Sequence, residues 1–418
     1  MWEGFCNIAQ SAWWGRVWTL QEAVLAPEAS LHYGVWRIPW KEIADADANS
    51  SSHEGRCCVG ARNAILGDVY GKIYKLLDAV GNISFARRPR PQGASRPNFR
   101  NTQVVFRGRD CKEPRDRIYG MLGLFDYGEK LKLVPDYSLN LSDVYTRAFR
   151  SMIEEFDGDL QPLLGFGFNS DRNGLPSWVP DFTLSMDAQL QRREHFRFAF
   201  QYPQYDACKG MKATMAFEDD KWFRLRGVQV GVVQASSMPQ RMDSWPEVSK
   251  VTRELAQLAN VPTTHSDTSS KFSKPYEMFW RTVIADIYYE NEGNDYKRIS
   301  EDHFLVYEQL RTRAINDTKL SMRHPKFDFA GVICSVLDDR SFFITKEGLF
   351  GVGPTNLQPE DEIWVLYGGR VPFVLRKTTN NALQNQNSYK FIGDCYYHGV
   401  MDGQALNNSA PESTVILI

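Results

Sequence analysis

The chain has 418 residues, 43% of them hydrophobic and 24% charged, which is typical of a globular protein of two or three domains. The net charge of −2 provides no overall field, so neither nucleic acid nor an anionic membrane is an expected partner. The seven cysteines are scattered and lack Cys-x-x-Cys spacing, which argues against a disulfide framework and a zinc site. There is no signal sequence and no apolar run long enough to span a membrane, so the sequence predicts a cytoplasmic protein.

The first predicted element is a short amphipathic helix from Trp13 to Leu25. Its spacing places four residues on one face: Trp14, Trp18, Gln21 and Leu25. Pro27 prevents continuation because proline has no N–H to donate. Glu22 lies one turn after Trp18, so a carboxylate and an indole share one edge of this helix. The simplest interpretation is a core-facing tryptophan beside a solvated glutamate.

A strand is predicted at Ser30 to Gly34, with Trp36 to Trp40 turning away from it. The polar stretch Asp45 to Gly55 is typical of a loop. Ala61 to Val80 is a predicted helix with Gly81 at its C-cap. The Arg- and Pro-rich stretch from Phe85 to Arg100 fits an import signal or a nucleic-acid contact, but a solvated loop explains it better.

Glu113 to Leu124 is predicted to be a helix with Pro114 in its first turn. Its Arg115, Asp116 and Arg117 suggest either catalysis or an ion-pair and hydrogen-bond clamp to neighbouring elements, and we favour the clamp. A second helix follows, capped by Ser142 and ended by Gly158, with an apolar face of Val144, Tyr145, Ala148, Phe149, Met152 and Ile153. Leu175 to Phe182 is an extended connector that packs its tryptophan.

From Phe196 onward, alternating β-branched residues at Trp222 to Val233 predict a strand pair. Further helices are predicted at Val248–Asn260, Tyr276–Tyr289 and Asp302–Ile315, and a polar loop at Pro262–Lys274. After about Phe327, short apolar runs separated by Gly, Pro, Asn and Asp predict a small all-β barrel.

Common catalytic sequences are absent: there is no Gly-x-x-x-x-Gly-Lys-Ser/Thr loop, no His-Glu-x-x-His and no Gly-x-Ser-x-Gly elbow. Gly348, Gly351 and Gly353 do not fit a dinucleotide fingerprint and are better explained as turn glycines. We therefore expect no metal and no bound cofactor. Among the histidines, His398 lies between turn residues, where a structural role is the simpler interpretation.

The run Arg16-Val17-Trp18-Thr19-Leu20-Gln21-Glu22 resembles the end of the fungal heterokaryon-incompatibility (HET) domain, whose hallmark is Arg-x-Trp-Thr-Leu-Gln-Glu. Two further segments resemble that family and contribute Pro114, Arg115, Asp116, Arg117, Tyr119 and Gly120, and then Pro135, Asp136 and Tyr137. Weaker similarities at 175–181, 280–282, 368–373 and 393–403 follow in the family's order, so that the resemblance covers most of the chain.

In that family the signature lies late in a Toll/interleukin-receptor-like α/β domain. The resemblance implies that residues 1–40 are a remnant of this domain, its last helix and edge strand, and it leaves open whether Met1 is the true start. The implied fold class is α+β, with a truncated α/β edge at the N-terminus. A helical body is expected at 41–195, a mixed α+β segment at 196–326 and the small barrel at 327–418.

The resemblance implies a role in non-self recognition after hyphal fusion, linked to programmed cell death. This chain would act mainly as an interaction or regulatory portion with a protein partner. Two alternatives remain open, namely a NAD-cleaving effector that uses Glu22 and a degenerate fragment without function.

Some Toll/interleukin-receptor-like domains cleave NAD with one glutamate in a helix whose Trp-x-Leu-x-Glu wording is similar to residues 18–22. Nicotinamide leaves as a neutral amine, so one anion near the developing ribose cation suffices. Glu22 would be the catalytic residue, with NAD as a substrate and not a cofactor. Because earlier strands build most of the pocket in such domains, we do not expect this activity from this chain alone, and it stays an open alternative for a longer parent.

Overall fold

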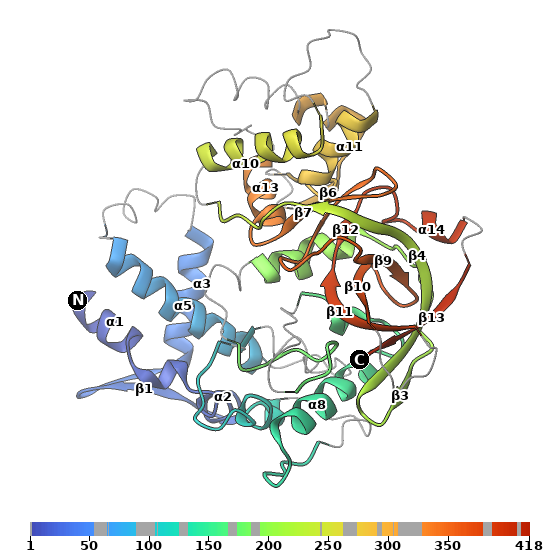
Figure 1. The fold of residues 1–418 in the computed structure, drawn as a ribbon. Helices are drawn as coiled ribbons and strands as arrows, with labels where there is room; N and C mark the ends of the chain where they lie inside the picture. The colour runs from blue at the N-terminus through green and yellow to red at the C-terminus, as the bar shows by residue number, and fades with distance from the viewer. Residues whose placement is uncertain are drawn as a thin grey trace. The chain divides into compact units, whose positions relative to one another are not determined.

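The computed structural model describes residues 2–53, 65, 67–88, 105–106, 108–124, 133–165, 174–184, 193–242, 245–261, 274–290, 295–303, 305–307, 328–378, 387–407 and 411–418. The chain is α+β, as predicted (Figure 1). It divides into two compact units. Unit 1 comprises Met1–Ala148 and Phe182–Asp187, and unit 2 comprises Phe149–Asp181 and Ala188–Ile418.

Unit 1 is mainly helical, and its described part holds one β-hairpin. Its elements in chain order are α1 (Trp2–Ala9), the 3-10 turn η1 (Ala12–Gly15), α2 (Thr19–Leu25), β1 (Ser30–Tyr33), β2 (Trp36–Pro39), α3 (Trp40–His53), α5 (Gly67–Arg87), α7 (Asp116–Tyr119) and η2 (Leu122–Leu124). Helix α8 (Leu141–Glu155) crosses the boundary between the two units along the chain.

The predicted helix from Trp13 to Leu25 is wrong over its first half. The 3-10 turn ends at Gly15, and the next residue, Arg16, has an extended backbone (φ −83°, ψ 136°) and forms a parallel bridge with Asp110. The α-helix begins only at Thr19. Some backbone hydrogen bonds of residues 13–18 are therefore made with a distant segment, and helical spacing alone does not reveal this.

The segment after β1 returns alongside it instead of turning away. Strands β1 and β2 pair antiparallel, with Tyr33 opposite Trp36 and Ser30 opposite Pro39. The loop predicted at Asp45 to Gly55 is also wrong up to His53, because α3 runs through it. Tertiary packing overrides the low helix propensity of its Asn and Ser residues, since α3 lies against α5.

Gly81 does not end a helix, because α5 continues to Arg87. A Cβ on Gly81 would lie 2.7 Å from Asp47 Oδ2 on α3, so the missing side chain permits close packing of the two helices. The predicted start of this helix and most of the Arg- and Pro-rich loop lie outside the described residues.

The Glu113 to Leu124 segment is less regular than predicted. It forms the single turn α7 and then the 3-10 turn η2. Helix α8 is capped by Asn140 and not by Ser142, since Asn140 Oδ1 accepts a hydrogen bond from the Asp143 N–H at 2.9 Å. The apolar face predicted for α8 is confirmed, with all six side chains buried.

Unit 2 is organised around a nine-stranded sheet. Its strands are β3 (Ala216–Glu218), β4 (Trp222–Ser236), β7 (Ser341–Thr345), β8 (Phe350–Gly353), β9 (Glu362–Leu366), β10 (Phe373–Thr378), β11 (Ser388–Asp394), β12 (Tyr396–Tyr397) and β13 (Ser413–Leu417). The pairings β4–β13–β11–β10–β9 return to β4 and so form a closed circuit. All these contacts are antiparallel except β11 with β13.

The strand pair predicted at Trp222 to Val233 is instead one strand of 15 residues. Register shifts between Gln229 and Gly231 and between Val233 and Ala235 bend it, as β-bulges do. Strand β4 can therefore pair with β9 and β13 in the circuit and also with β7 beyond it. The residues of β4 precede the segment in which the barrel was predicted.

The other elements of unit 2 include α10 (Trp245–Leu258), α11 (Lys274–Val283), β5 (Ile287–Glu290), β6 (Asp295–Arg298), α13 (Phe329–Leu337) and α14 (Gln404–Asn407), together with the short helices η3 (Gln161–Leu163), η4 (Arg197–Gln201) and η5 (Tyr202–Gln204). The helix predicted at Tyr276–Tyr289 ends at Val283, after which the chain forms strand β5. The loop predicted at Pro262–Lys274 and most of the helix predicted at Asp302–Ile315 lie outside the described residues.

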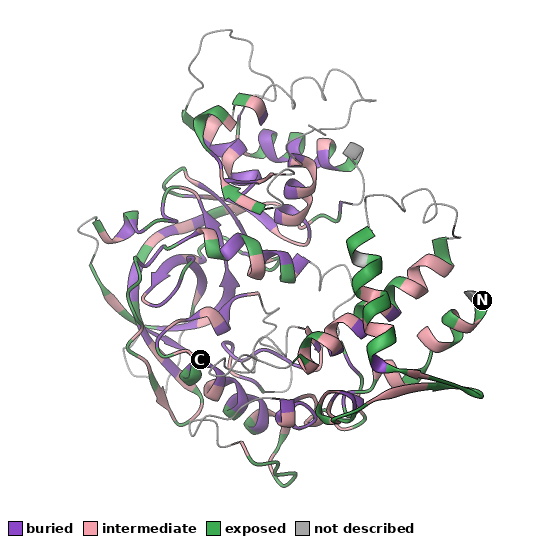
Figure 2. Cartoon of the chain, turned by 180° about the vertical axis from the view of Figure 1, so that it is seen from behind, coloured by how far each residue is buried: buried purple, intermediate pink, exposed green. Residues whose placement is uncertain are grey.

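Buried side chains are concentrated along the sheet of unit 2, whereas the β1–β2 hairpin of unit 1 is largely exposed (Figure 2). Trp178 packs its indole as predicted. It is fully buried against Phe149, Phe217 and Phe223, and its Nε1 donates a hydrogen bond to the Lys221 carbonyl at 3.2 Å.

Gly227 gives a direct test of the strand circuit. A Cβ there would lie 2.5 Å from the carbonyl oxygen of Val365, so Gly227→Ala must push β4 away from β9. We expect a loss of about 1–3 kcal/mol in the free energy of unfolding, measured by urea denaturation. The control is Gly71→Ala in α5, where a Cβ meets no atom within 4 Å and should stabilise the helix. An unchanged stability for Gly227→Ala would contradict this strand pairing.

Candidate functional site

The family-like segment at residues 16–22 is anchored by its backbone and by Thr19. The Val17 N–H donates a hydrogen bond to the Asp110 carbonyl at 3.0 Å. The Thr19 hydroxyl is buried and lies 2.7 Å from the Arg16 carbonyl, which it can reach as a donor. Arg16 itself has an exposed side chain, so its role in the described structure is carried by its backbone.

Asp116 accepts hydrogen bonds from two other family-like segments. Trp18 Nε1 donates to Asp116 Oδ2 at 3.0 Å, and the Tyr137 hydroxyl donates to Asp116 Oδ1 at 2.7 Å. Partial burial, followed by this hydrogen bond, raises the pKa of Tyr137 to about 12, so its hydroxyl keeps its proton at neutral pH. One carboxylate therefore joins the N-cap of α2, helix α7 and the Pro135–Tyr137 segment.

Gln21 makes the second contact between α2 and the 113–124 segment. Its Nε2 donates to the Gly120 carbonyl at 2.9 Å and lies 3.4 Å from the Tyr119 carbonyl. A Cβ on Gly120 would come within 3.0 Å of Val17, and one on Gly123 within 2.6 Å of Gln21 Oε1. These two glycines therefore let the segment approach α2 closely.

Arg115 also contacts the chain around the Pro135–Tyr137 segment. It donates to both carboxylate oxygens of Glu113, at 2.7 and 3.0 Å, and to the carbonyls of Tyr137 and Leu139. The hydrogen bond from Arg115 lowers the pKa of Glu113. The Tyr119 hydroxyl adds a hydrogen bond to the Asp136 carbonyl at 3.0 Å. Asp136 also accepts from Ser138, which lowers the pKa of Asp136.

The remaining family-like residues also make internal contacts. The Pro114 carbonyl accepts a hydrogen bond from Tyr145 at 2.7 Å, and Arg117 donates to the Arg109 carbonyl at 3.0 Å. Pro135 directly precedes Asp136, and the turn that follows lies at residues 137–138. The structure thus brings residues 16–22, 113–124 and 135–137 together, in a hydrogen-bonded and ion-paired arrangement of the kind that the clamp interpretation describes.

Two arginines that sequence reasoning did not single out complete this region. Arg109 is 8% exposed and lies 3.4 Å from both the Arg16 carbonyl and Thr19 Oγ1, and burial lowers its pKa to about 10. Arg87 donates to the Ala23 and Pro27 carbonyls at the end of α2. Such cations commonly bind the last carbonyls of helices, but no local pattern paired Arg87 with a helix so far away in the sequence.

Glu22 lies apart from this clamp and lines a cavity of about 640 Å³ within unit 1. Its carboxylate has no hydrogen bond or ion pair with any described residue, and neither has that of Glu28, which lines the same cavity. Three indoles, those of Trp13, Trp14 and Trp40, contribute to the walls. The pairing of a free carboxylate with aromatic walls can stabilise positive charge.

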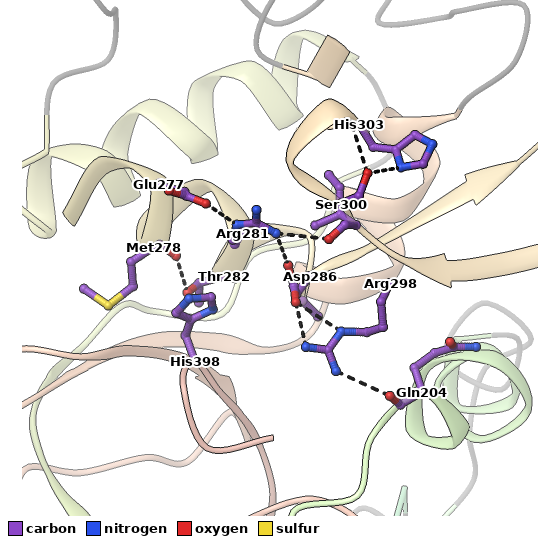
Figure 3. A network of polar contacts seen from close by, with 12 residues as sticks. Gln204, Glu277, Met278, Arg281, Thr282, Asp286, Arg298, Ser300, His303 and His398 are labelled. Carbon is purple, nitrogen blue, oxygen red and sulfur yellow. Dashed lines mark hydrogen bonds and ion pairs between the residues drawn. The ribbon is translucent and has the colours of Figure 1, made fainter. Parts of the chain in front are cut away.

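His398, the histidine singled out from the sequence, lies at a polar network in unit 2 (Figure 3). Its Nδ1 is 2.8 Å from the Tyr396 hydroxyl, and burial lowers its pKa. Nearby, Asp286 binds Arg281 and Arg298, each at 2.7 Å. Because these charges are paired, the network fits a structural role.

A second buried group in unit 2 involves Asp394 from the family-like 393–403 segment. Asp394 accepts hydrogen bonds from Arg340 at 3.0 Å and Tyr202 at 2.7 Å, and from the Gly165 N–H at 3.1 Å. Burial opposes ionisation of Asp394, but these partners lower its pKa below the ordinary value. Asp394 therefore joins three distant parts of the unit.

Two other kinds of feature are absent from the described part of the chain. It contains no group of three or more His, Cys, Asp or Glu side chains that could hold a metal ion. A helix long and apolar enough to cross a membrane is also absent from those residues.

These observations define the chain as an α+β protein. Unit 2 contains the strand circuit, and unit 1 contains the three clamped segments. Residues 332–416 match a family model described as the Het-6 beta-barrel domain. Heterokaryon incompatibility protein 6, OR allele, of Neurospora crassa is 22% identical over an alignment 468 positions long, which covers 98% of this chain. The alignment spans 66% of that relative's length. No solved structure matches the chain. The two matches show that the chain is similar to a fungal heterokaryon-incompatibility protein along most of its length, and that residues 332–416 are similar to the Het-6 beta-barrel domain.

Asp116 is the residue on which the clamp depends most directly. Asp116→Asn leaves one acceptor oxygen for two donors, Trp18 and Tyr137, and we expect a loss of about 1–2 kcal/mol in the free energy of unfolding. Urea denaturation measures it.

The matched control is Asp68→Asn, an exposed carboxylate at the start of α5 whose replacement should change stability by less than about 0.5 kcal/mol. In a double-mutant cycle, Asp116→Asn and Tyr137→Phe should be less than additive because they remove the same hydrogen bond. Full additivity would show that the two residues do not interact.

Proposed function

We propose that the chain acts in fungal heterokaryon incompatibility, where it contributes to non-self recognition after hyphal fusion and to the programmed cell death that follows. The observation that carries this proposal is the similarity to heterokaryon incompatibility protein 6 over 98% of the chain. In this proposal the chain works in the cytoplasm, and residues 1–40 correspond to the edge of a Toll/interleukin-receptor-like domain.

The clamp supports an interaction or regulatory role over chemistry at the family-like residues. Trp18, Gln21, Arg115 and Asp116 all direct polar atoms to other parts of unit 1. Groups committed in this way stabilise one arrangement of the backbone and are not available to a substrate.

The β1–β2 hairpin supports contact with a protein partner. Val35 at its tip is 94% exposed, Trp36 is 71% exposed and Tyr33 is 40% exposed. Large apolar side chains gathered on one exposed turn are a feature of protein-contact surfaces. We propose that this tip touches the partner.

An incompatibility assay tests the proposal. Expression of the chain in a strain of incompatible background should reduce growth and cause cell death at hyphal fusion, scored by a vital dye. The double variant Val35→Ser, Trp36→Ser should lose most of this effect because it removes the exposed apolar contact.

The matched control is Leu258→Ser, since Leu258 is also exposed (40%) but lies at the end of α10 in unit 2. It should keep full activity. If the unaltered chain has no effect in any background, the proposal is wrong and a degenerate fragment becomes the better explanation.

A second candidate function is NAD cleavage by Glu22, and one observation favours it. Glu22 lines the unit 1 cavity together with three tryptophans, and its carboxylate has no hydrogen bond or ion pair with a described residue. There it could stabilise the positive charge that develops on the ribose as nicotinamide departs. The described lining contains no Lys or Arg to neutralise a pyrophosphate, so this activity belongs to a longer protein and not to this chain alone.

Nicotinamide release from NAD, followed by chromatography, tests this second function. We expect no release by the chain itself and, in a longer parent, release that Glu22→Gln abolishes while Glu42→Gln, an exposed glutamate on α3, leaves it intact. Equal release by both variants would remove Glu22 from the mechanism.

A further inference from the structure

The cavity of unit 1 is lined by three tryptophans and two glutamates, among other residues. Trp13 and Trp14 meet edge to face with ring centroids 4.9 Å apart, and Trp40 lies 6.2 Å from Trp14. Two of these indoles are fixed by hydrogen bonds of their own, Trp14 to the Ile8 carbonyl and Trp40 to Ser84. Two of the three indoles are therefore held in place by contacts outside the cavity.

The charge of the lining has one sign. Glu22 and Glu28 bring two carboxylates, and His32 is the sole described lining residue able to carry a positive charge. Two arginines form hydrogen bonds with lining residues without lining the cavity: Arg37 with Ser30 Oγ and Arg87 with the Ala23 carbonyl. The carboxylates themselves have no described partner.

We propose that this cavity binds a small organic cation, an amine or quaternary ammonium ion attached to an apolar or aromatic body. Indole faces attract cations through their quadrupole, and two carboxylates without a partner among the described residues supply the opposite charge. A volume of about 640 Å³ suits a ligand of this class. The same lining disfavours anions, including phosphate groups, because it offers them two like charges.

This binding site goes beyond the proposed incompatibility role and does not require NAD cleavage. A ligand held against α2 and the β1 strand would contact elements that carry the family-like segment, since the lining includes Glu22 and Ala23 from α2 and Ser30 to Tyr33 from β1. The cation would thereby stabilise unit 1 on binding.

Isothermal titration calorimetry of the full chain with benzyltrimethylammonium chloride tests the proposal. We expect saturable binding with a Kd on the order of 0.1–1 mM at low salt, and weaker binding as ionic strength rises. Benzyl alcohol, which is neutral, and benzoate, which is an anion, should both bind much more weakly than the cation.

Isosteric variants identify the groups responsible. Glu22→Gln and Glu28→Gln, at two exposed residues, should each raise the Kd by about three- to fivefold, the effect of one exposed charge, and the double variant by about tenfold or more. Glu42→Gln removes a carboxylate outside the lining and should leave the Kd unchanged.

Two results would overturn the proposal. One is the absence of saturable benzyltrimethylammonium binding by the unaltered chain, with its fold verified by circular dichroism. The other is a Kd that the Glu22→Gln, Glu28→Gln double variant leaves unchanged. Neither result depends on nicotinamide release or hyphal death, so this proposal can fail while either function stands.

Discussion

The structure depends on backbone groups that find partners far along the chain, because buried N–H and C=O groups must be hydrogen-bonded. Strand β4 meets this requirement in unit 2 by pairing with β9 and β13, which closes the circuit that the later strands form. In unit 1 the extended residues beside Arg16 pair with Asp110 and break a helix that local spacing favours. In both units a long-range pairing decides where local elements begin and end.

The carboxylates of Asp116 and Glu22, both in family-like segments, differ in their partners. This difference indicates that Asp116 has a structural role and that Glu22 can contact a ligand. Asp116 has both oxygens occupied, by Trp18 and by Tyr137, and so works as a joint between segments. Glu22 lies on the same helix as Gln21 but lines a cavity and has no described partner. A free carboxylate retains solvation that a ligand must replace, so it can discriminate between ligands by charge, whereas Asp116 cannot without breaking the clamp.

The sequence predicted the α+β class, the apolar face of α8 and the burial of Trp178, because these follow from local period and from aromatic burial. It also indicated which segments matter, yet it could not show that Trp18 and Tyr137 meet on one carboxylate. The errors share a cause. The loop predicted at Asp45 became α3, and the strand pair at Trp222 became a single bent strand, because packing against distant elements overrode local composition. The cavity was beyond reach, since its lining comes from several elements.

The charge of the cavity also limits how Glu22 could serve catalysis. NAD carries two phosphates, and a site that held them beside Glu22 and Glu28 would need positive groups to offset four negative charges. Arg87 is committed to the carbonyls that end α2, and Arg16 lies outside the lining. The described lining therefore suits the positively charged nicotinamide ring better than the two phosphates of the dinucleotide. A complete NAD site would require cations from residues beyond this lining, whereas recognition of an organic cation requires nothing more than the residues already present.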